Sequence, residues 1–299
     1  MRLRRAPKGA GSAKIPPLPQ PVTISSGHMA VSVSVLASGS RGNCTLVSSS
    51  STRILVDAGL SGRETFKRLR GLGERTEDIS AILITHEHSD HVAGLERLAT
   101  KLNVPVYLTE GTHHAWNRAC RDAGDKGDGK APELPKSEHF HSGRSFRIGD
   151  IEISPFTIPH DAADPVGFTF HADGIKIGFA TDLGYMPVSV RNHLRGSTVL
   201  LIESNHDVER LRFGPYPWSV KQRVMSRVGH LSNDALAEFF TNDYDGVAEY
   251  VVLAHLSEQN NHPEIARASA EQALRGRQGL WNNRLLLAAQ TEAIAPIRL

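Results

Sequence analysis

Short apolar runs separated by polar turns make up the part of the chain that follows residue 30. The runs are rich in Val, Ile and Leu, and clusters of Gly, Ser and Asn lie between them, which is typical of strands joined by turns. Strands are expected over 31–37, 44–49, 53–59, 81–85 and 104–108. Apolar residues recur at helical spacing over 92–102, and further helices are expected over 62–72 and 111–123.

The second half of the chain repeats this alternation after a loop expected over 122–136. Strands are expected over 138–142, 144–149, 151–159, 166–173, 175–182, 197–204 and 249–257, and helices over 220–229, 233–242 and 263–276. In both halves strands precede helices, and polar loops follow the strand ends. This order predicts an α/β fold, namely a four-layer αββα sandwich that residues 29–299 form as a single domain.

Residues 1–28 differ from the rest of the chain in composition. They are rich in Pro, Gly and Ser and contain five basic residues and no acidic one. Such a segment buries too little apolar surface to offset the entropy cost of ordering it, and it lacks the apolar core of a secretory signal. We expect a disordered basic tail, which either touches DNA or precedes a true start at Met29.

Composition narrows the class of protein. The chain has 299 residues and no apolar run of the roughly 18 residues that span a membrane, so no membrane partner is expected. Its two cysteines, Cys44 and Cys120, cannot form a disulfide framework, which favours the reducing cytoplasm. The net charge is +2, but beyond residue 28 there are 29 basic residues (34 less the five of the tail) against 32 acidic ones. Nucleic-acid binding would therefore require a local patch.

Histidine and aspartate gather directly after the expected strand 81–85. His86, His88, Asp90 and His91 lie within six residues. Since His86 and His88 are two positions apart, they would not share a helix face, and a loop is needed to turn both toward one point. Imidazole and carboxylate together suit zinc, manganese or iron. The sequence therefore predicts a metal site.

Single polar residues follow three other expected strands. They are His160, Asp182 and His255. Together with the first cluster they make seven potential ligands, the number that two adjacent metal ions require. Two such ions lower the pKa of a shared water and stabilise charge on a carbonyl or phosphoryl oxygen, so the set indicates a hydrolase.

The pattern HxHxDH followed by a separate His, Asp and His resembles the metallo-β-lactamase superfamily. The resemblance implies that one metal is held by His86, His88 and His160 and the other by Asp90, His91 and His255, with Asp182 between them. It also gives Asp90 a role in orienting or deprotonating the water, and it leaves Glu87 without a ligand role. Histidine rather than Glu at the second ligand position favours hydrolysis over redox chemistry.

Longer strings resemble one bacterial family within it, called YycJ or WalJ, whose members are regarded as 5′→3′ DNA exonucleases. The matching strings are SGSRGNC (38–44), ATDLGY (180–185), IESNHD (202–207), GPYPWSVKQRV (214–224), GHLSN (229–233) and LAHLSEQNNHPE (253–264). The likeness runs from about Val33 to about Ala266. It implies a DNA substrate with double-stranded ends and two divalent ions, either zinc or manganese. The sequence indicates no oligomeric state.

Two segments outside the ligands offer nucleic-acid contacts. Tyr216, Trp218, Lys221 and Arg223 combine aromatic and basic groups that would stack on a base and hold phosphates, although the aromatics equally suit a packed core. Arg41 and Asn43 lie in a Gly-rich turn and are expected either to contact a phosphate or to shape the turn.

His230 is the second candidate catalytic residue. Its segment GHLSN is similar to a His-containing segment of the tRNA-maturing ribonuclease Z branch, in which that His is associated with the scissile phosphate. The other interpretation is a residue that merely packs beside a helix N-cap. Glu203 and His206 resemble a pair that orients His230 or a metal ligand.

Three other functions remain compatible with the same ligands. The first is an RNA-processing nuclease, but only 72 residues lie between Asp182 and His255, which leaves no room for the domain that β-CASP nucleases insert there. The second is a hydrolase of small thioesters or lactams, which would not need the segment around Trp218. The third is a non-catalytic binding module, against which the complete ligand set argues.

Overall fold

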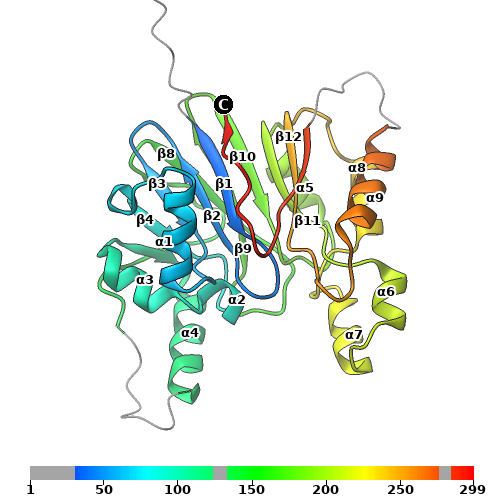
Figure 1. Cartoon of the computed structure of the whole chain (residues 1–299), viewed down its shortest axis with the longest axis horizontal. Helices are drawn as coiled ribbons and strands as arrows, with labels where there is room; N and C mark the ends of the chain where they lie inside the picture. Colours follow the sequence, from blue (N-terminus) through cyan, green and yellow to red (C-terminus); the bar gives the residue numbers. More distant parts are fainter. Residues whose placement is uncertain (1–30, 124–132, 276–283) are drawn as a thin grey trace, which may run out of the picture.

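Two seven-stranded sheets lie face to face, and helices cover their outer sides (Figure 1). The computed structural model describes residues 31–123, 133–275 and 284–299, to which all structural statements refer. The expected tail over 1–28 and most of the expected loop over 122–136 lie outside these ranges. The predicted αββα sandwich is confirmed.

The first sheet has the order β14-β1-β2-β3-β4-β5-β6. Its strands are β1 (Ser32–Ala37), β2 (Cys44–Ser48), β3 (Arg53–Val56), β4 (Ala81–Leu83), β5 (Val106–Leu108), β6 (Ser137–His139) and β14 (Ile297–Arg298). β14, β1, β2 and β3 pair antiparallel, whereas β3 to β6 pair parallel. The parallel pairs direct the ends of β3 and β4 toward the same edge of the sheet.

The second sheet has the order β13-β12-β11-β10-β9-β8-β7. Its strands are β7 (Phe146–Ile148), β8 (Ile151–Thr157), β9 (Val166–Ala172), β10 (Ile175–Ala180), β11 (Val199–Glu203), β12 (Tyr250–Ala254) and β13 (Arg284–Leu287). β10 to β13 run parallel, so their carboxyl ends lie at one edge. All twelve predicted strands are present. β13 and β14, which the sequence did not predict, each pair at an outer position.

Side-chain alternation along the strands explains the layers. In β3, Ile54 and Val56 face the core between the two sheets, while Leu55 packs against helices. Helices α1 (Gly62–Gly71), α3 (Leu95–Leu102) and α4 (Glu110–Ala123) cover the first sheet, and α5 (Val188–Leu194), α8 (Asn233–Asn242) and α9 (Pro263–Arg275) cover the second. Because successive side chains of a strand point to opposite faces, one face of each sheet packs against the other sheet and the second face packs against helices.

The helix predicted over 92–102 is α3, which begins three residues later than expected. A short turn, α2 (Ser89–Val92), ends before Gly94, and α3 starts at Leu95. A Cβ at position 94 would lie 1.9 Å from the carbonyl oxygen of Leu60, so only Gly allows this approach. His86 and His88 precede α2, as the predicted loop requires, whereas Asp90 and His91 lie on the helical turn itself.

Two further helices follow β11 in the chain. The expected helix over 220–229 is α7 (Trp218–Val224), and α6 (Val208–Phe213) and the 3₁₀ turn over Thr76–Asp78 were not predicted, nor was α5. α2 and α7 line the same cavity, together with residues that follow the carboxyl ends of the parallel strands. Among the helices in the described ranges, none is long and apolar enough to cross a membrane.

Candidate metal centre

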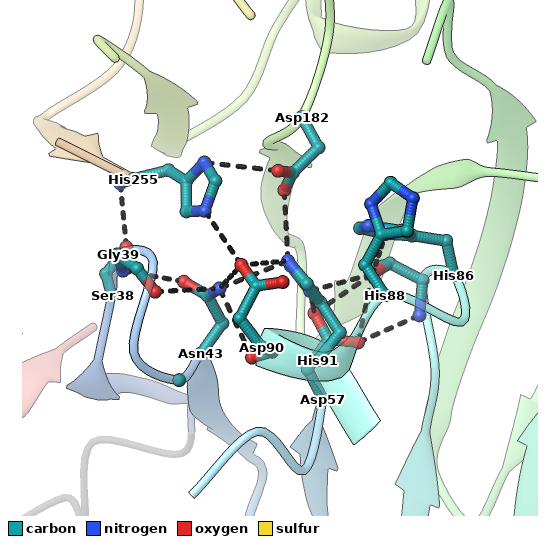
Figure 2. Close-up of polar contacts among 12 residues, drawn as sticks. Ser38, Gly39, Asn43, Asp57, His86, His88, Asp90, His91, Asp182 and His255 are labelled. Atoms are coloured by element: carbon teal, nitrogen blue, oxygen red, sulfur yellow. Dashed lines mark hydrogen bonds and ion pairs between the residues drawn. The ribbon is translucent and has the colours of Figure 1, made fainter. Parts of the chain in front are cut away.

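Four strand ends bring the predicted ligands to one place (Figure 2). His86 follows β4, His160 follows β8, Asp182 follows β10 and His255 follows β12. Together with α2 they surround a cavity of about 300 Å³. The cavity is lined by Ser40, His88, Ser89, Asp90, Asp182, Asn205, Tyr216, Arg223, Val224, His230, His255, Ser257 and Asn260. The residues that the sequence predicts as ligands thus lie together at the carboxyl edge of the two sheets.

Three site residues adopt the left-handed backbone region. The φ angles are 63° for Asp57, 63° for Asp182 and 54° for His255, and each residue lies one or two positions beyond a strand. This region costs a residue other than Gly on the order of 1 kcal/mol or more, and such strain concentrates at functional sites. Here the sharp turn directs each side chain back over the strand end and into the centre.

His86, His88 and His160 form the first cluster. Each offers one ring nitrogen, and these atoms lie within 4.8 Å of one another. Nε2 of His160 lies 3.1 Å from Nδ1 of His88. The other nitrogen of His160, Nδ1, donates to the carbonyl of Gly229 at 3.1 Å. Nε2 is then the unprotonated nitrogen, and its lone pair faces the cluster.

The first cluster suits a cation. Burial lowers the pKa of both His86 and His160, which keeps their rings neutral, the form that binds metal. Nε2 of His86 is buried and has no hydrogen-bond partner among the described residues. A buried polar atom without a partner costs roughly 1–3 kcal/mol, and a metal ion would satisfy it.

Asp90, His91 and His255 form the second cluster, again with one ligand atom each within 4.8 Å. Oδ2 of Asp90 lies 3.3 Å from Nε2 of His255 and 3.4 Å from Nε2 of His91. Burial opposes charge on the two histidines, yet Asp182 and the other carboxylates raise the pKa of both well above its usual value. The carboxylates of the centre therefore favour positive charge beside them, and divalent cations would supply it.

Asp182 lies between the two clusters. Its Oδ2 is 3.4 Å from Nε2 of His91, its Oδ1 is 3.1 Å from Nδ1 of His255, and it also forms a group with His86 and His91. Oδ2 is buried and accepts no hydrogen bond within the described residues. Asp182 thus lies within ligand distance of residues from both clusters.

Sequence reasoning missed Asp57, which holds the second cluster in place. Its carboxylate accepts hydrogen bonds from Nδ1 of His91 at 2.8 Å and from the backbone N–H of Thr85 at 2.9 Å. The bond fixes the tautomer of His91 and leaves its Nε2 facing Asp90 and Asp182. The available signal was the one used for the other ligands, a polar residue that ends an apolar strand.

Glu203 supports two histidines at once. Its Oε1 accepts from Nδ1 of His230 at 2.8 Å and from Nδ1 of His255 at 2.9 Å. Its Oε2 accepts from the backbone N–H of Leu183 and Leu231. Although burial opposes its charge, His230 and His255 hold the pKa of Glu203 well below its usual range. The predicted association of Glu203 with His230 and a ligand matches these contacts.

His206 is also close by, but its ring makes no hydrogen bond to Glu203, His230 or a candidate ligand within the described ranges. Burial lowers the pKa of His206 to about 4. Its backbone instead bridges Ser232 and accepts from Asn233. The geometry therefore connects His206 to the start of α8.

The predicted nucleic-acid contacts divide into two groups. Tyr216 and Arg223 line the cavity, Trp218 is 62% exposed and Arg41 is exposed in an ion pair with Glu258. Arg223 pairs with Asp161.

Asn43 and Lys221 are turned away from solvent. Asn43 is 6% exposed, and its amide donates to Oδ2 of Asp90 at 3.2 Å and faces Nε2 of His91 at 3.1 Å. Lys221 is 9% exposed, and its Nζ donates to the carbonyl of Arg212. Both polar groups are occupied within the protein.

Comparison with known proteins agrees with this geometry. Residues 52–256 match the model of the beta-lactamase superfamily domain. The chain is 40% identical to exodeoxyribonuclease YycJ of Bacillus anthracis over 252 residues. This match covers 82% of the chain and 90% of the relative. The chain is also 40% identical over 233 residues to exodeoxyribonuclease WalJ of Streptococcus pneumoniae, with 78% and 84% covered. The solved structure of the metallo-β-lactamase-fold protein YhfI from Bacillus subtilis has a TM-score of 0.61 at 15% identity and covers 88% of this chain and 99% of its own.

Proposed function

The chain belongs to the beta-lactamase superfamily and is a metal-dependent hydrolase with the metallo-β-lactamase fold, and from this premise we propose that it is a two-metal exodeoxyribonuclease that degrades DNA from a 5′ end. The observation that carries the proposal is the position of Asp182 between two ligand clusters, beside a cavity walled by Tyr216 and Arg223. The fold implies divalent metal ions, and the unpartnered Nε2 of His86 and Oδ2 of Asp182 fit them.

In this proposal one ion is held by His86, His88 and His160 and the other by Asp90, His91 and His255, with Asp182 shared. Zinc and manganese both suit this set of imidazoles and carboxylates. When bound, the ions would activate a water and stabilise the charge that develops on the phosphoryl oxygens.

Asp90 is the residue that orients the attacking water. Asn43 fixes one of its oxygens, and the side chain also lines the cavity. Burial opposes its charge, but His91 and His255 hold the pKa of Asp90 far below the usual value, so the carboxylate stays ionised and accepts a hydrogen bond from the water.

The DNA would enter past α7. Tyr216 and the exposed Trp218 offer faces on which bases stack, and Arg223 and Arg41 offer charge to phosphates. We give Asn43 and Lys221 structural roles instead, because their polar groups are already bonded inside the protein. Double-stranded ends as the substrate and the cytoplasm as the compartment complete the proposal, the latter because both cysteines are free.

Digestion of linear duplex DNA labelled at its 5′ end tests this function. Metal-free protein is reconstituted with Mn²⁺ or Zn²⁺, and Asp90→Ala serves as the control. Release of the label as short products by the wild-type protein alone supports the proposal and identifies the working metal. Absence of DNA cleavage by a protein that binds two ions would overturn it, and structured RNA and thioesters would be the next substrates.

The substitution Glu203→Gln is expected to weaken metal binding and turnover by about 10–100-fold, as loss of a residue that orients a ligand does. An amide cannot accept from both histidines and both backbone N–H groups, so at least one buried donor loses its acceptor. Competition with a chelator measures the metal affinity, and thermal unfolding reports the fold. Glu238→Gln on the exposed side of α8 is the matched control. Unchanged metal affinity in Glu203→Gln would contradict the orienting role.

A further inference from the structure

Helices α1 and α3 lie on the outer side of the first sheet (Figure 1), and a groove is lined by residues of both. It consists of two cavities of about 470 and 390 Å³, which share Phe66, Arg70 and Lys101 as lining residues. The first cavity is lined further by Arg63 and Arg97. We call the five residues Arg63, Phe66, Arg70, Arg97 and Lys101 the basic groove.

Helical spacing places the cations on facing surfaces. Arg63, Phe66 and Arg70 lie three and four positions apart and share one face of α1. Arg97 and Lys101 lie four positions apart and share one face of α3. Phe66 is buried between them, and the ammonium of Lys101 lies 5.0 Å from the centre of its ring. The groove therefore has an apolar floor and cationic walls.

None of the four cations of the basic groove forms an ion pair with any residue in the described ranges. On the other side of α1, by contrast, Glu64 pairs with both Lys67 and Arg68. Like charges four residues apart on a helix destabilise it, so Arg97 and Lys101 disfavour each other until an anion lies beside them. One acid, Glu77, lines the far end of the groove.

The groove begins beside the metal centre. Its near end is lined by Ala93 and Gly94, which directly follow the turn α2 that carries Asp90 and His91. Tyr216 and Arg223 wall the metal centre from the opposite side. A strand that reaches the centre past α7 would continue over α2 and arrive at Arg63 and Arg97.

We propose that the basic groove is a second DNA-binding surface, which holds the phosphates of the substrate away from the bond that is cut. This inference rests on the proposed function. The extent of the groove, two adjoining cavities with a cation on each wall, suits a polyanion better than a small anion. Because the chain beyond residue 28 has more acidic than basic residues, four unpaired cations here form the local patch that DNA binding requires.

The salt dependence of DNA binding tests the basic groove. Fluorescence anisotropy measures the affinity of the metal-loaded protein for a duplex with phosphorothioate terminal linkages, which resist hydrolysis, over a range of KCl concentrations. The slope of log K against log salt is negative, and each lost phosphate contact reduces its magnitude by about 0.9. Arg97→Ala/Lys101→Ala should therefore reduce the magnitude by about 1.8. Arg63→Ala/Arg70→Ala, on the other wall, should do the same.

Arg144→Ala/Arg195→Ala is the control, because it removes two exposed charges near β7 and α5. Its slope should equal that of the wild-type protein. Equal slopes in the groove variants and the wild-type protein would overturn the inference, and so would an equal loss in the control, which would show a general field effect. If the wild-type protein cleaves no DNA with either metal, the proposed function fails instead, whatever the slopes are.

Discussion

Asp182→Asn is expected to abolish hydrolysis and to release metal. The side chain is buried between the clusters, with one carboxylate oxygen 3.1 Å from His255 and the other 3.4 Å from His91. An amide replaces one of these oxygens by an NH₂ group, which has no lone pair for a cation and adds a donor beside imidazoles. Since loss of an orienting partner already costs about 10–100-fold, we expect loss of this shared group to cost at least about 1,000-fold in kcat.

The fold should survive this change. Asp182 has a φ of 63°, and Asn is one of the few residues that adopt this region readily. Asp173→Asn provides a matched control, because Asp173 also has a positive φ (48°) but lies in the exposed turn between β9 and β10. Metal analysis, thermal unfolding and the rate of DNA hydrolysis are compared for the two variants. Wild-type metal content and rate in Asp182→Asn would refute the shared position of this carboxylate.

The sequence predicts the ligand set because each ligand follows an apolar strand. Since β3 to β6 and β10 to β13 pair parallel, the ends of strands far apart in the chain meet at one edge, and a polar residue at such an end has to face the cavity. Asp57 carries the same signal after β3 but was counted as part of the strand run 53–59. The pattern of apolar residues identifies the presence of a strand more reliably than it identifies the residue at which the strand ends.

Other features depend on packing that no local pattern contains. Asn43 and Lys221 have the chemistry of phosphate-binding residues, and only the neighbouring segments decide that their polar groups point inward. β13 and β14 are short and rely on strands β12 and β1, which lie far away in sequence. The basic groove combines two helices whose facing surfaces meet only in the folded chain. Residue chemistry is thus readable from the sequence, while side-chain direction is not.

His230→Ala is expected to lower kcat by about 100-fold or more while metal content is unchanged, as loss of a general acid does. Nδ1 of His230 is bonded to Glu203, so Nε2 is the ring nitrogen left for the cavity that the residue lines. Burial opposes charge on this ring, but Glu203 and Asp182 outweigh it and raise the pKa of His230. The ring is therefore poised to hold a phosphate oxygen or to protonate the leaving oxygen.

Metal content distinguishes this role from a ligand role. His230 belongs to a group with Asp182, Glu203 and His255 whose ligand atoms lie within 4.8 Å, so the geometry alone allows it to hold an ion. If His230→Ala loses an ion, the residue is a ligand or its close support, and the catalytic role is wrong. His171→Ala, an exposed histidine at the end of β9, should retain both rate and metal. If His230→Ala alone hydrolyses DNA slowly and still binds its full complement of metal, this imidazole either holds a phosphate oxygen or protonates the leaving oxygen.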